Sequence, residues 1–365
     1  MKKLVSLPSI SGNEHEIADF LAKFLSKLKF DVETISVAGC GPTVLARYVF
    51  TDEEPCLLLY GHIDTVEPCK GWSYPPFKPT VIGRRLYGLG SGDMKGGVAA
   101  IVAAVSKLSK MKLKGSLLVA LASDEELHSK GCNMLIRSGR LKGVDAAISA
   151  EPVGLNVMMI GRGGRIVYDV AVRGISRHGA EVNQEDNAVV EASKLVAELK
   201  RLPFGRWRGI QGSITVLSMS GGTEFLSTPD SCKMLIDRYI VPGETKKETL
   251  TQLQDLVKKL NSKAKFNVRL MKRTTPFPEP YVLRGDSRII GIVEEACRNV
   301  CGVKPKKAFG LSVADDNFLV VKGKIPTVTL GPKGGNEHAP NEYADLFSVV
   351  NAAKIYLKSM ELYLK

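Results

Sequence analysis

Histidine and carboxylate side chains recur in this sequence directly after apolar runs or inside glycine-rich turns, and both residue types can bind divalent metal ions. The chain of 365 residues has five histidines, so the position of each one carries information. The residues placed in this way are His62, Asp64, Asp93, Glu125, Glu126 and Glu151.

The spacing of His62 and Asp64 places both side chains on the same side of a strand, because alternate strand residues point the same way. Carboxylates that gather around a histidine repel one another unless cations neutralise them. Imidazole together with carboxylate suits zinc, cobalt or manganese better than calcium. The pattern therefore predicts a site for such a metal.

Each of these residues alone also has a structural interpretation. A single histidine near a strand is more often a satisfied structural residue than a ligand, and adjacent glutamates are usually a solvated face. Asp93 lies in GLGSGDMKGG, which as a glycine-rich loop could be mistaken for a phosphate cradle. That stretch lacks the GK[ST] ending of a P-loop and the GxGxxG spacing. A joint site is favoured because these residues follow predicted strands, in order.

The pattern of apolar residues in segment 1–163 predicts the β-sheet that must position these side chains. The unbroken apolar runs CLLLYG, SLLVALAS and AAISA alternate with helical stretches such as GGVAAIVAAVSKL. This pattern is typical of a largely parallel sheet covered by helices on both faces, and such sheets bind ligands at the carboxyl ends of their strands. Ser11 and Glu14 are interpreted as a capping box that opens the first long helix.

Residues 164–274 change in character and predict the order β-α-β-β-α-β, the split βαβ arrangement of a ferredoxin-like domain. Residues 275–365 return to the first pattern, with RIIGIVEEACRNV, IPTVTLG and a C-terminal helix. We therefore expect an α/β catalytic domain formed by residues 1–163 and 275–365. The α+β domain of residues 164–274 is inserted into it.

Composition limits the classes of partner. The net charge is +13 and the pI is about 9.3, but the lysines are spread over predicted helix faces and no aromatic-basic module is present. Nucleic-acid binding is therefore not expected, and the positive field would attract small anionic substrates. No apolar run approaches the length of a membrane span, and MKKLVSLPSISG reaches a turn too soon for a signal peptide. Together with seven scattered cysteines, this predicts a soluble cytoplasmic protein with reduced thiols and no membrane partner.

Several motifs, in order along nearly the whole chain, resemble those of the M20 metallopeptidases and deacylases. They are PSISGNE, LLLYGHIDTV, RRLYGLGSGDMKGG, ASDEELHSKG, SAEP, DRYIVPGE and IPTVTLGPKGGNEHAPNEY. The resemblance implies a zinc-exopeptidase-like catalytic domain with an inserted lid or dimerisation domain. It also implies two divalent metal ions, usually zinc, with cobalt or manganese as alternatives.

The resemblance further implies which residues would act. One ion would be held by His62, Asp93 and Glu151. The other would be held by His338, Glu126 and the same Asp93, which would bridge the two.

Three more residues resemble the catalytic groups of the family. Asp64 would accept the ring N–H of His62, and Glu125 would be the general base for a metal-bridging water. His178, in the inserted domain, would stabilise the oxyanion, although an ordinary surface histidine is the alternative. The peptide bond between Asp93 and Met94 is expected to be cis, as in relatives.

The substrate contacts are less determined. Arg238, Gly334 and Gly335 are candidate substrate-binding residues, with a structural ion pair as the alternative for Arg238. Leu226 occupies the position of an asparagine that contacts substrate in many relatives, and an apolar side chain cannot replace the hydrogen bonds of an amide. The identity of the substrate therefore does not transfer directly from a relative.

The function implied is that of a two-metal amidohydrolase cleaving the amide bond of an N-acyl amino acid, as a deacetylase or desuccinylase does. A carboxypeptidase or dipeptidase acting on small peptides is the alternative within the family. A non-catalytic metal-binding relative is the alternative outside it. A homodimer formed through the inserted domain is expected by resemblance.

Overall fold

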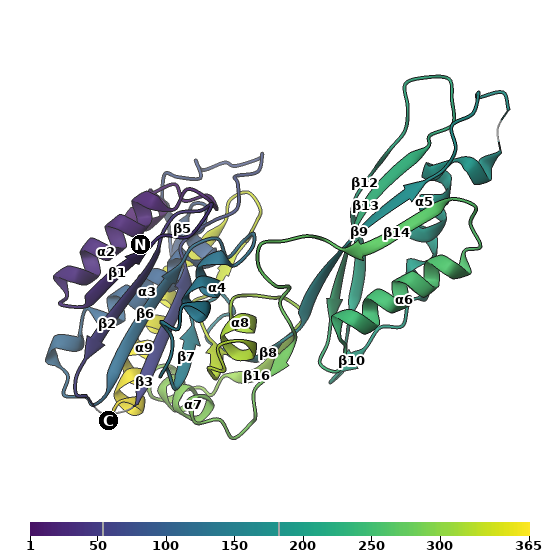
Figure 1. Cartoon of the computed structure of the whole chain (residues 1–365). Helices are drawn as coiled ribbons and strands as arrows, with labels where there is room; N and C mark the ends of the chain where they lie inside the picture. The colour runs from purple at the N-terminus through teal and green to yellow at the C-terminus, as the bar shows by residue number, and fades with distance from the viewer. Residues whose placement is uncertain (53–54, 182) are drawn as a thin grey trace. The chain divides into compact units, whose positions relative to one another are not determined.

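The fold is described by a computed structural model covering residues 1–52, 55–181 and 183–365 (Figure 1). The described residues divide into two compact units. The larger unit comprises Met1–Gly161, Val282–Phe309 and Ala314–Lys365, and the smaller unit comprises Arg162–Tyr281 with Gly310–Val313. The division falls close to the expected boundaries. The lid function attached to the inserted segment stays a prediction.

A nine-stranded mixed sheet forms the centre of the larger unit in the described part of the chain. Its strands are β1 (Asp31–Ile35), β2 (Thr43–Val49), β3 (Cys56–His62), β6 (Ser116–Ala122), β7 (Ala146–Ser149), β8 (Val157–Arg162), β15 (Tyr281–Val282), β16 (Lys306–Gly310) and β17 (Thr327–Thr329). They lie in the order β1-β2-β6-β3-β7-β17-β8-β15, with β16 paired to β8. The central strands β6, β3, β7 and β17 are parallel, whereas β1, β2 and β8 are antiparallel to their neighbours. The predicted α/β class with a mostly parallel centre is confirmed.

Helices cover both faces of this sheet, because its central strands are apolar along their whole length and must be buried on both sides. The helices of the larger unit are α1 (Lys2–Val5), α2 (His15–Lys27), α3 (Gly96–Val105), α4 (Lys130–Arg137), α7 (Arg288–Cys301), α8 (Asp316–Val321) and α9 (Leu346–Tyr363). Helix α9 packs against α3 and α7, α4 packs against α8, and α2 packs on β1 and β2.

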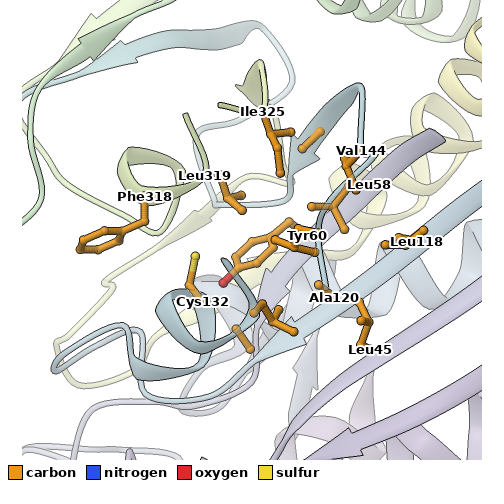
Figure 2. Close-up of a cluster of buried hydrophobic side chains, with 14 of the residues drawn as sticks. Leu45, Leu58, Tyr60, Leu118, Ala120, Cys132, Val144, Phe318, Leu319 and Ile325 are labelled. Atoms are coloured by element: carbon orange, nitrogen blue, oxygen red, sulfur yellow. The ribbon is translucent and has the colours of Figure 1, made fainter. Parts of the chain in front are cut away.

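The side chains of β3 show how apolar residues pack on both faces of the central sheet. Figure 2 shows Leu58 and Tyr60 of β3 within a buried cluster that includes Cys132 from α4 and Phe318 from α8. The opposite face of β3 meets α3 so closely that a Cβ on Gly61 would lie 3.2 Å from Val98. The strand that ends at His62 is therefore fixed from both sides.

A second, four-stranded sheet of the larger unit was not predicted from the sequence. It consists of β4 (Thr80–Ile82), β5 (Arg85–Tyr87), β18 (Gly334–Gly335) and β19 (Tyr343–Asp345), in the order β18-β19-β5-β4. Its strands are only two or three residues long and carry little apolar alternation, so periodicity could not reveal them.

The smaller unit has the predicted order of elements. They are β9 (Gly164–Arg173), α5 (Ala188–Glu198), β12 (Ser213–Gly221), β13 (Ser231–Ile240), α6 (Lys246–Lys259) and β14 (Lys265–Leu270). The four strands form an antiparallel sheet in the order β12-β13-β9-β14, and the two helices share one buried core with it. A short hairpin of β10 (Arg206–Trp207) and β11 (Ile210–Gln211) is added to this ferredoxin-like arrangement.

The predicted capping box at the start of α2 is wrong. Glu14 is the N-cap residue of α2, and no side chain caps the helix. The hydroxyl of Ser11 instead donates to Asp64 Oδ2 at 2.7 Å, and the Glu14 carboxylate accepts the backbone N–H groups of Gly12, Gly41 and Asp124. Both side chains are engaged in tertiary contacts, which the local SxxE pattern cannot distinguish from a cap.

Two expectations from composition can be compared with the structure. All seven cysteines are described, and each carries a free thiol. Among the described residues, every helix is too short or too polar to cross a bilayer.

Candidate metal centre

The predicted ligands of the larger unit follow three adjacent parallel strands at one edge of the sheet. His62 is the last residue of β3, and Glu126 and Glu151 follow β6 and β7, the two neighbours of β3. Because parallel strands end at the same edge, side chains from distant parts of the sequence are brought together there. The sequence predicted this convergence, and the structure shows it.

Asp93 comes from the turn Ser91–Lys95, which leads directly into α3. Its Oδ1 lies 3.1 Å from His62 Nε2, and its Oδ2 lies 3.5 Å from His338 Nε2. One carboxylate therefore faces two histidines with its two oxygens. The peptide bond between Asp93 and Met94 is cis, which confirms the expectation.

The described residues contain two groups of side chains that could each hold a metal ion. Within each group the possible ligand atoms lie within 4.8 Å of one another. The groups are His62 with Asp93 and Glu151, and His338 with Asp93 and Glu126. They share Asp93, as the resemblance implies for a bridged pair of ions.

The two groups differ in their access to solvent. His62 is 1% exposed and Glu151 is buried, so the first group is enclosed by protein. His338 is 52% exposed and lies 3.0 Å from Glu126 Oε2. The second group is therefore open to solvent on its histidine side.

Asp64 fixes the tautomer of His62. The Nδ1 atom of His62 lies 3.1 Å from the backbone oxygen of Asp64 and 3.3 Å from its Oδ1. Since both of these atoms are acceptors, Nδ1 must carry a hydrogen, so the neutral ring would present the lone pair of Nε2 to a bound ion. Burial disfavours the imidazolium, but the hydrogen bonds to Asp64 and Asp93 outweigh it and raise the pKa of His62 well above its usual value.

Asp64 also holds the backbone of the glutamate pair. Its Oδ1 accepts the N–H of Glu125 and its Oδ2 accepts the N–H of Glu126, both at 3.1 Å. Burial opposes ionisation of Asp64, but the contact with His62 and the hydrogen bonds from Ser11 and Glu125 lower its pKa. A single enclosed carboxylate thus orients one predicted ligand and the turn that carries the predicted base.

The predicted base, Glu125, has a strongly raised pKa. Burial is the largest cause, and the carboxylates of Glu151 and Glu126 add to it, while His62 opposes it. Burial likewise raises the pKa of Glu126. His338 shows the complementary effect, because hydrogen bonds to Asp93 and Glu126 raise its pKa to about 10. The local field is therefore strongly negative, and cations would relieve it.

The turn that carries Asp93 is supported by residues that the sequence did not single out. Glu342 accepts the backbone N–H groups of Gly90, Gly92 and Asp93, and burial raises the pKa of Glu342 to about 7. Lys95 is fully buried and donates to the carbonyl oxygen of Leu7 at 2.9 Å. Glu342 lies four residues after His338, and this proximity in NEHAPNEY was the available signal.

Gly334 and Gly335 form β18, which leads into the segment that carries His338. A Cβ on Gly334 would lie 2.9 Å from the Cα of Gly92, next to Asp93. A Cβ on Gly335 would lie 2.7 Å from the Tyr343 hydroxyl. Close packing against the Asp93 turn and β19 therefore explains both glycines, and their contact with substrate stays a prediction.

The side chains present fit a pair of divalent cations. The donor set is imidazole nitrogen and carboxylate oxygen, the combination that suits zinc, cobalt or manganese. The carboxylates of Asp93, Glu126 and Glu151 converge with Glu125 in a partly enclosed space, where unneutralised charges would be costly. Two divalent cations would balance these four carboxylates.

The remaining predicted residues lie in the smaller unit. His178 is exposed, and its Nδ1 accepts the N–H of Ala180 at 3.2 Å. Leu226 is 87% exposed, and its carbonyl oxygen accepts the N–H of Gly179. The predicted oxyanion donor and the unusual leucine therefore belong to one pair of hydrogen-bonded loops.

Arg238 is completely buried in the smaller unit. Its Nη2 donates to Glu244 Oε1 at 2.9 Å and to the carbonyl oxygen of Pro203 at 2.7 Å. An enclosed guanidinium presents no surface to a substrate. This is the structural ion pair that the sequence left open as the alternative.

The sequence profile of peptidase family M20/M25/M40 matches residues 58–362 of the chain. The chain belongs to this peptidase family. The match includes all five predicted metal ligands and Glu125, and it confirms the resemblance. The M20 chain is therefore a hydrolase that acts on amide bonds and depends on metal ions.

Known relatives extend over the whole M20 chain. The succinyl-diaminopimelate desuccinylase of Wolinella succinogenes is 27% identical over 99% of this chain and 98% of its own length. A tripeptidase from Staphylococcus aureus has a TM-score of 0.84 at 20% identity, covering 99% of this chain and 96% of its own. A dinuclear metal binding M20 peptidase from Bacillus subtilis has a TM-score of 0.76 at 15% identity, covering 100% and 96%. At these identities the two solved structures establish the fold.

Proposed function

We propose that this protein removes the acyl group from an N-acyl amino acid by hydrolysis at a two-metal centre, with zinc as the resident metal. The observation that carries the proposal is the shared position of Asp93, whose two oxygens face His62 and His338. This arrangement gives two sets of ligands joined by one carboxylate, with Glu125 beside them. Cobalt or manganese could occupy the same ligands.

The chemistry divides between the metals and the chain. When bound, the two ions would supply positive charge that lowers the pKa of a water molecule and polarises the amide carbonyl. The Glu125 carboxylate would accept the proton of the attacking water and pass it to the nitrogen of the leaving amine. Asp64 would keep the Glu125 backbone and the His62 ring in place during both transfers.

The relative from Wolinella succinogenes makes N-succinyl-diaminopimelate the first substrate to test. A succinyl amide carries one extra carboxylate group, and the chain's net charge of +13 would draw such an anion from solution. N-acetylated amino acids are the second class. An expected place in metabolism is amino-acid biosynthesis, where acyl groups protect an amine until a late step.

The deciding experiment is hydrolysis by the purified protein loaded in turn with zinc, cobalt and manganese. The panel contains N-succinyl-diaminopimelate, N-acetylornithine, N-acetyl-lysine, N-acetylmethionine and several dipeptides. Turnover of an acyl amino acid, with dipeptides untouched, supports the proposal. A protein that binds two ions but turns over none of these compounds would contradict the proposal and favour the alternative of a non-catalytic metal-binding protein.

A carboxypeptidase or dipeptidase is the second candidate, and Leu226 is the observation that favours it. An exposed leucine stands where many relatives offer an amide to the substrate, and Phe225 beside it is also exposed. Two apolar side chains in that loop suit a substrate with an apolar side chain better than a succinyl group. Preferential turnover of apolar dipeptides in the same panel would establish this candidate.

We expect His178→Ala to lower kcat by about 10²–10³ with unchanged metal content, if His178 donates to the oxyanion. Since Nδ1 of His178 accepts the Ala180 N–H, the neutral ring carries its hydrogen on Nε2, ready to donate. Steady-state kinetics and metal analysis check this. His15→Ala, at an exposed histidine of α2, is the matched control and should keep normal turnover. A normal kcat in the His178 variant would remove His178 from the mechanism.

A homodimer formed through the smaller unit is also part of the proposal. Strand β12 lies at the edge of its sheet, and Leu217 and Met219 on it are exposed. An edge strand with exposed apolar side chains is a surface on which a second copy can pair. Sedimentation should therefore give twice the chain mass of 39.6 kDa, and Leu217→Lys should shift the particle toward the monomer. A wild-type protein that stays monomeric at every concentration would contradict the dimer.

A further inference from the structure

Two buried glutamates outside the predicted ligand set each accept three backbone N–H groups near the metal centre. Glu342 is 2% exposed and Glu14 is fully buried. A buried carboxylate is costly unless its oxygens are hydrogen-bonded, so each of these groups must be held by its donors. In both cases the donors include residues of a turn that carries predicted ligands.

Glu342 holds the turn of the bridging aspartate. Its Oε1 accepts the N–H of Gly92 at 2.8 Å and of Asp93 at 2.9 Å, and its Oε2 accepts the N–H of Gly90 at 2.8 Å. Glu342 also ends the segment that carries His338, between β18 and β19. It therefore ties the segments of two ligands to each other.

Glu14 holds the turn of the glutamate pair. Its Oε1 accepts the N–H of Asp124 at 3.1 Å and of Gly12 at 3.0 Å, and its Oε2 accepts the N–H of Gly41 at 2.6 Å. Asp124 has a φ of 63°, a conformation that costs free energy for a residue other than glycine. The contact with Glu14 stabilises this conformation immediately before Glu125 and Glu126.

The hydrogen bonds that Glu342 and Glu14 accept are formed within the protein alone. When these carboxyl groups are ionised, their hydrogen bonds from neutral N–H groups are about twice as strong as those between neutral groups. All the donors are backbone atoms, so the contacts do not depend on a bound ion. The two turns can therefore be held in place before any ion arrives.

We propose that Glu342 and Glu14 are positioning residues that hold the Asp93 turn and the Glu125–Glu126 turn in their metal-binding geometry. The inference rests on the two-metal centre of the proposed function. Glu342 acts on the shared ligand, so its loss affects both ions. Glu14 acts beside Glu126, so its loss affects the ion held by Glu126 and His338.

The test replaces each glutamate by glutamine, which has nearly the same shape but turns an NH2 group toward one of the N–H donors. Titration of the metal-free protein with zinc in a calorimeter gives both affinities. Glu342→Gln should weaken both about 10–100-fold, the range seen when residues supporting a metal ligand are lost. Glu14→Gln should weaken one affinity by a similar factor and leave the other unchanged. The spectrum of bound cobalt should change in the same pattern.

The control is Glu191→Gln, which replaces a fully buried glutamate of α5 in the smaller unit. It should lower the melting temperature without changing either affinity. Unchanged affinities in both Glu342→Gln and Glu14→Gln would overturn the inference while leaving the proposed function intact. A wild-type protein that binds fewer than two ions would instead contradict the proposed function.

A measurement on the wild-type protein keeps the inference testable if a variant does not fold. Amide hydrogen exchange of the metal-free chain should show protection at Gly92, Asp93 and Asp124. Rapid exchange at these amides that slows only after zinc is added would show that the ions, and not the glutamates, order the turns. That outcome would overturn the inference.

Discussion

Replacement of Glu125 by glutamine should lower kcat by about 10²–10⁴ while the protein keeps both ions, because this is the usual contribution of a general base. Glutamine has the shape of glutamate but cannot accept a proton. The Glu125 N–H bond to Asp64 involves the backbone and is retained in the variant. The measurement combines steady-state kinetics on the best substrate with metal analysis of the same sample.

The matched control for this variant is Glu337→Gln, at an exposed glutamate next to His338 that belongs to neither ligand group. It should keep kcat within a few-fold of the wild-type value. The loss of a general base lowers kcat by at least about 10²-fold, so the two results are easily distinguished. A Glu125→Gln variant with normal turnover would show that another group accepts the proton. A variant that loses its ions would show that Glu125 is a ligand.

Replacement of Asp93 by asparagine should remove both ions and abolish turnover, because Asp93 is the residue that the two ligand groups share. An amide offers one neutral oxygen in place of two charged ones, so it cannot serve two cations in the same way. His338→Ala should remove one ion and leave the enclosed group of His62, Asp93 and Glu151 occupied. Metal analysis after dialysis, in ions per chain, distinguishes the two variants.

Equal metal loss in the Asp93→Asn and His338→Ala variants would contradict the shared position of Asp93. Circular dichroism of both proteins shows whether either loss comes from unfolding. Neither substitution lies in the buried strand β3 or at its contacts with α3 and α4, so the fold should persist.

The sequence predicted the parts of this protein that depend on local pattern. The apolar runs before His62, Glu125 and Glu151 are long enough to be recognised as buried strands, and their parallel arrangement follows from the helices between them. The ferredoxin-like order of the smaller unit was predicted for the same reason. The convergence at the sheet edge then followed from the rule for parallel sheets.

What the sequence could not predict depends on contacts between distant segments. Glu14 looks like part of a helix cap, yet its donors come from Gly12, Gly41 and Asp124. Glu342 lies in a stretch whose strands are two or three residues long, too short to show a period. Arg238 could be a substrate contact or an ion pair until its enclosure is seen.

The positions of the two ligand groups along the chain also set the order in which the groups are completed during protein synthesis. His62, Asp93 and Glu151 all belong to the first half of the chain, whereas the second group waits for His338. The ribosome therefore synthesises every ligand of the enclosed group long before it adds His338, which completes the open group. Premature termination between Glu151 and His338 leaves a nascent product that has the ligands of the enclosed group but lacks His338 and Glu342. The ability to hold two ions is thus a property that the chain acquires only after the segment that carries His338 has been synthesised.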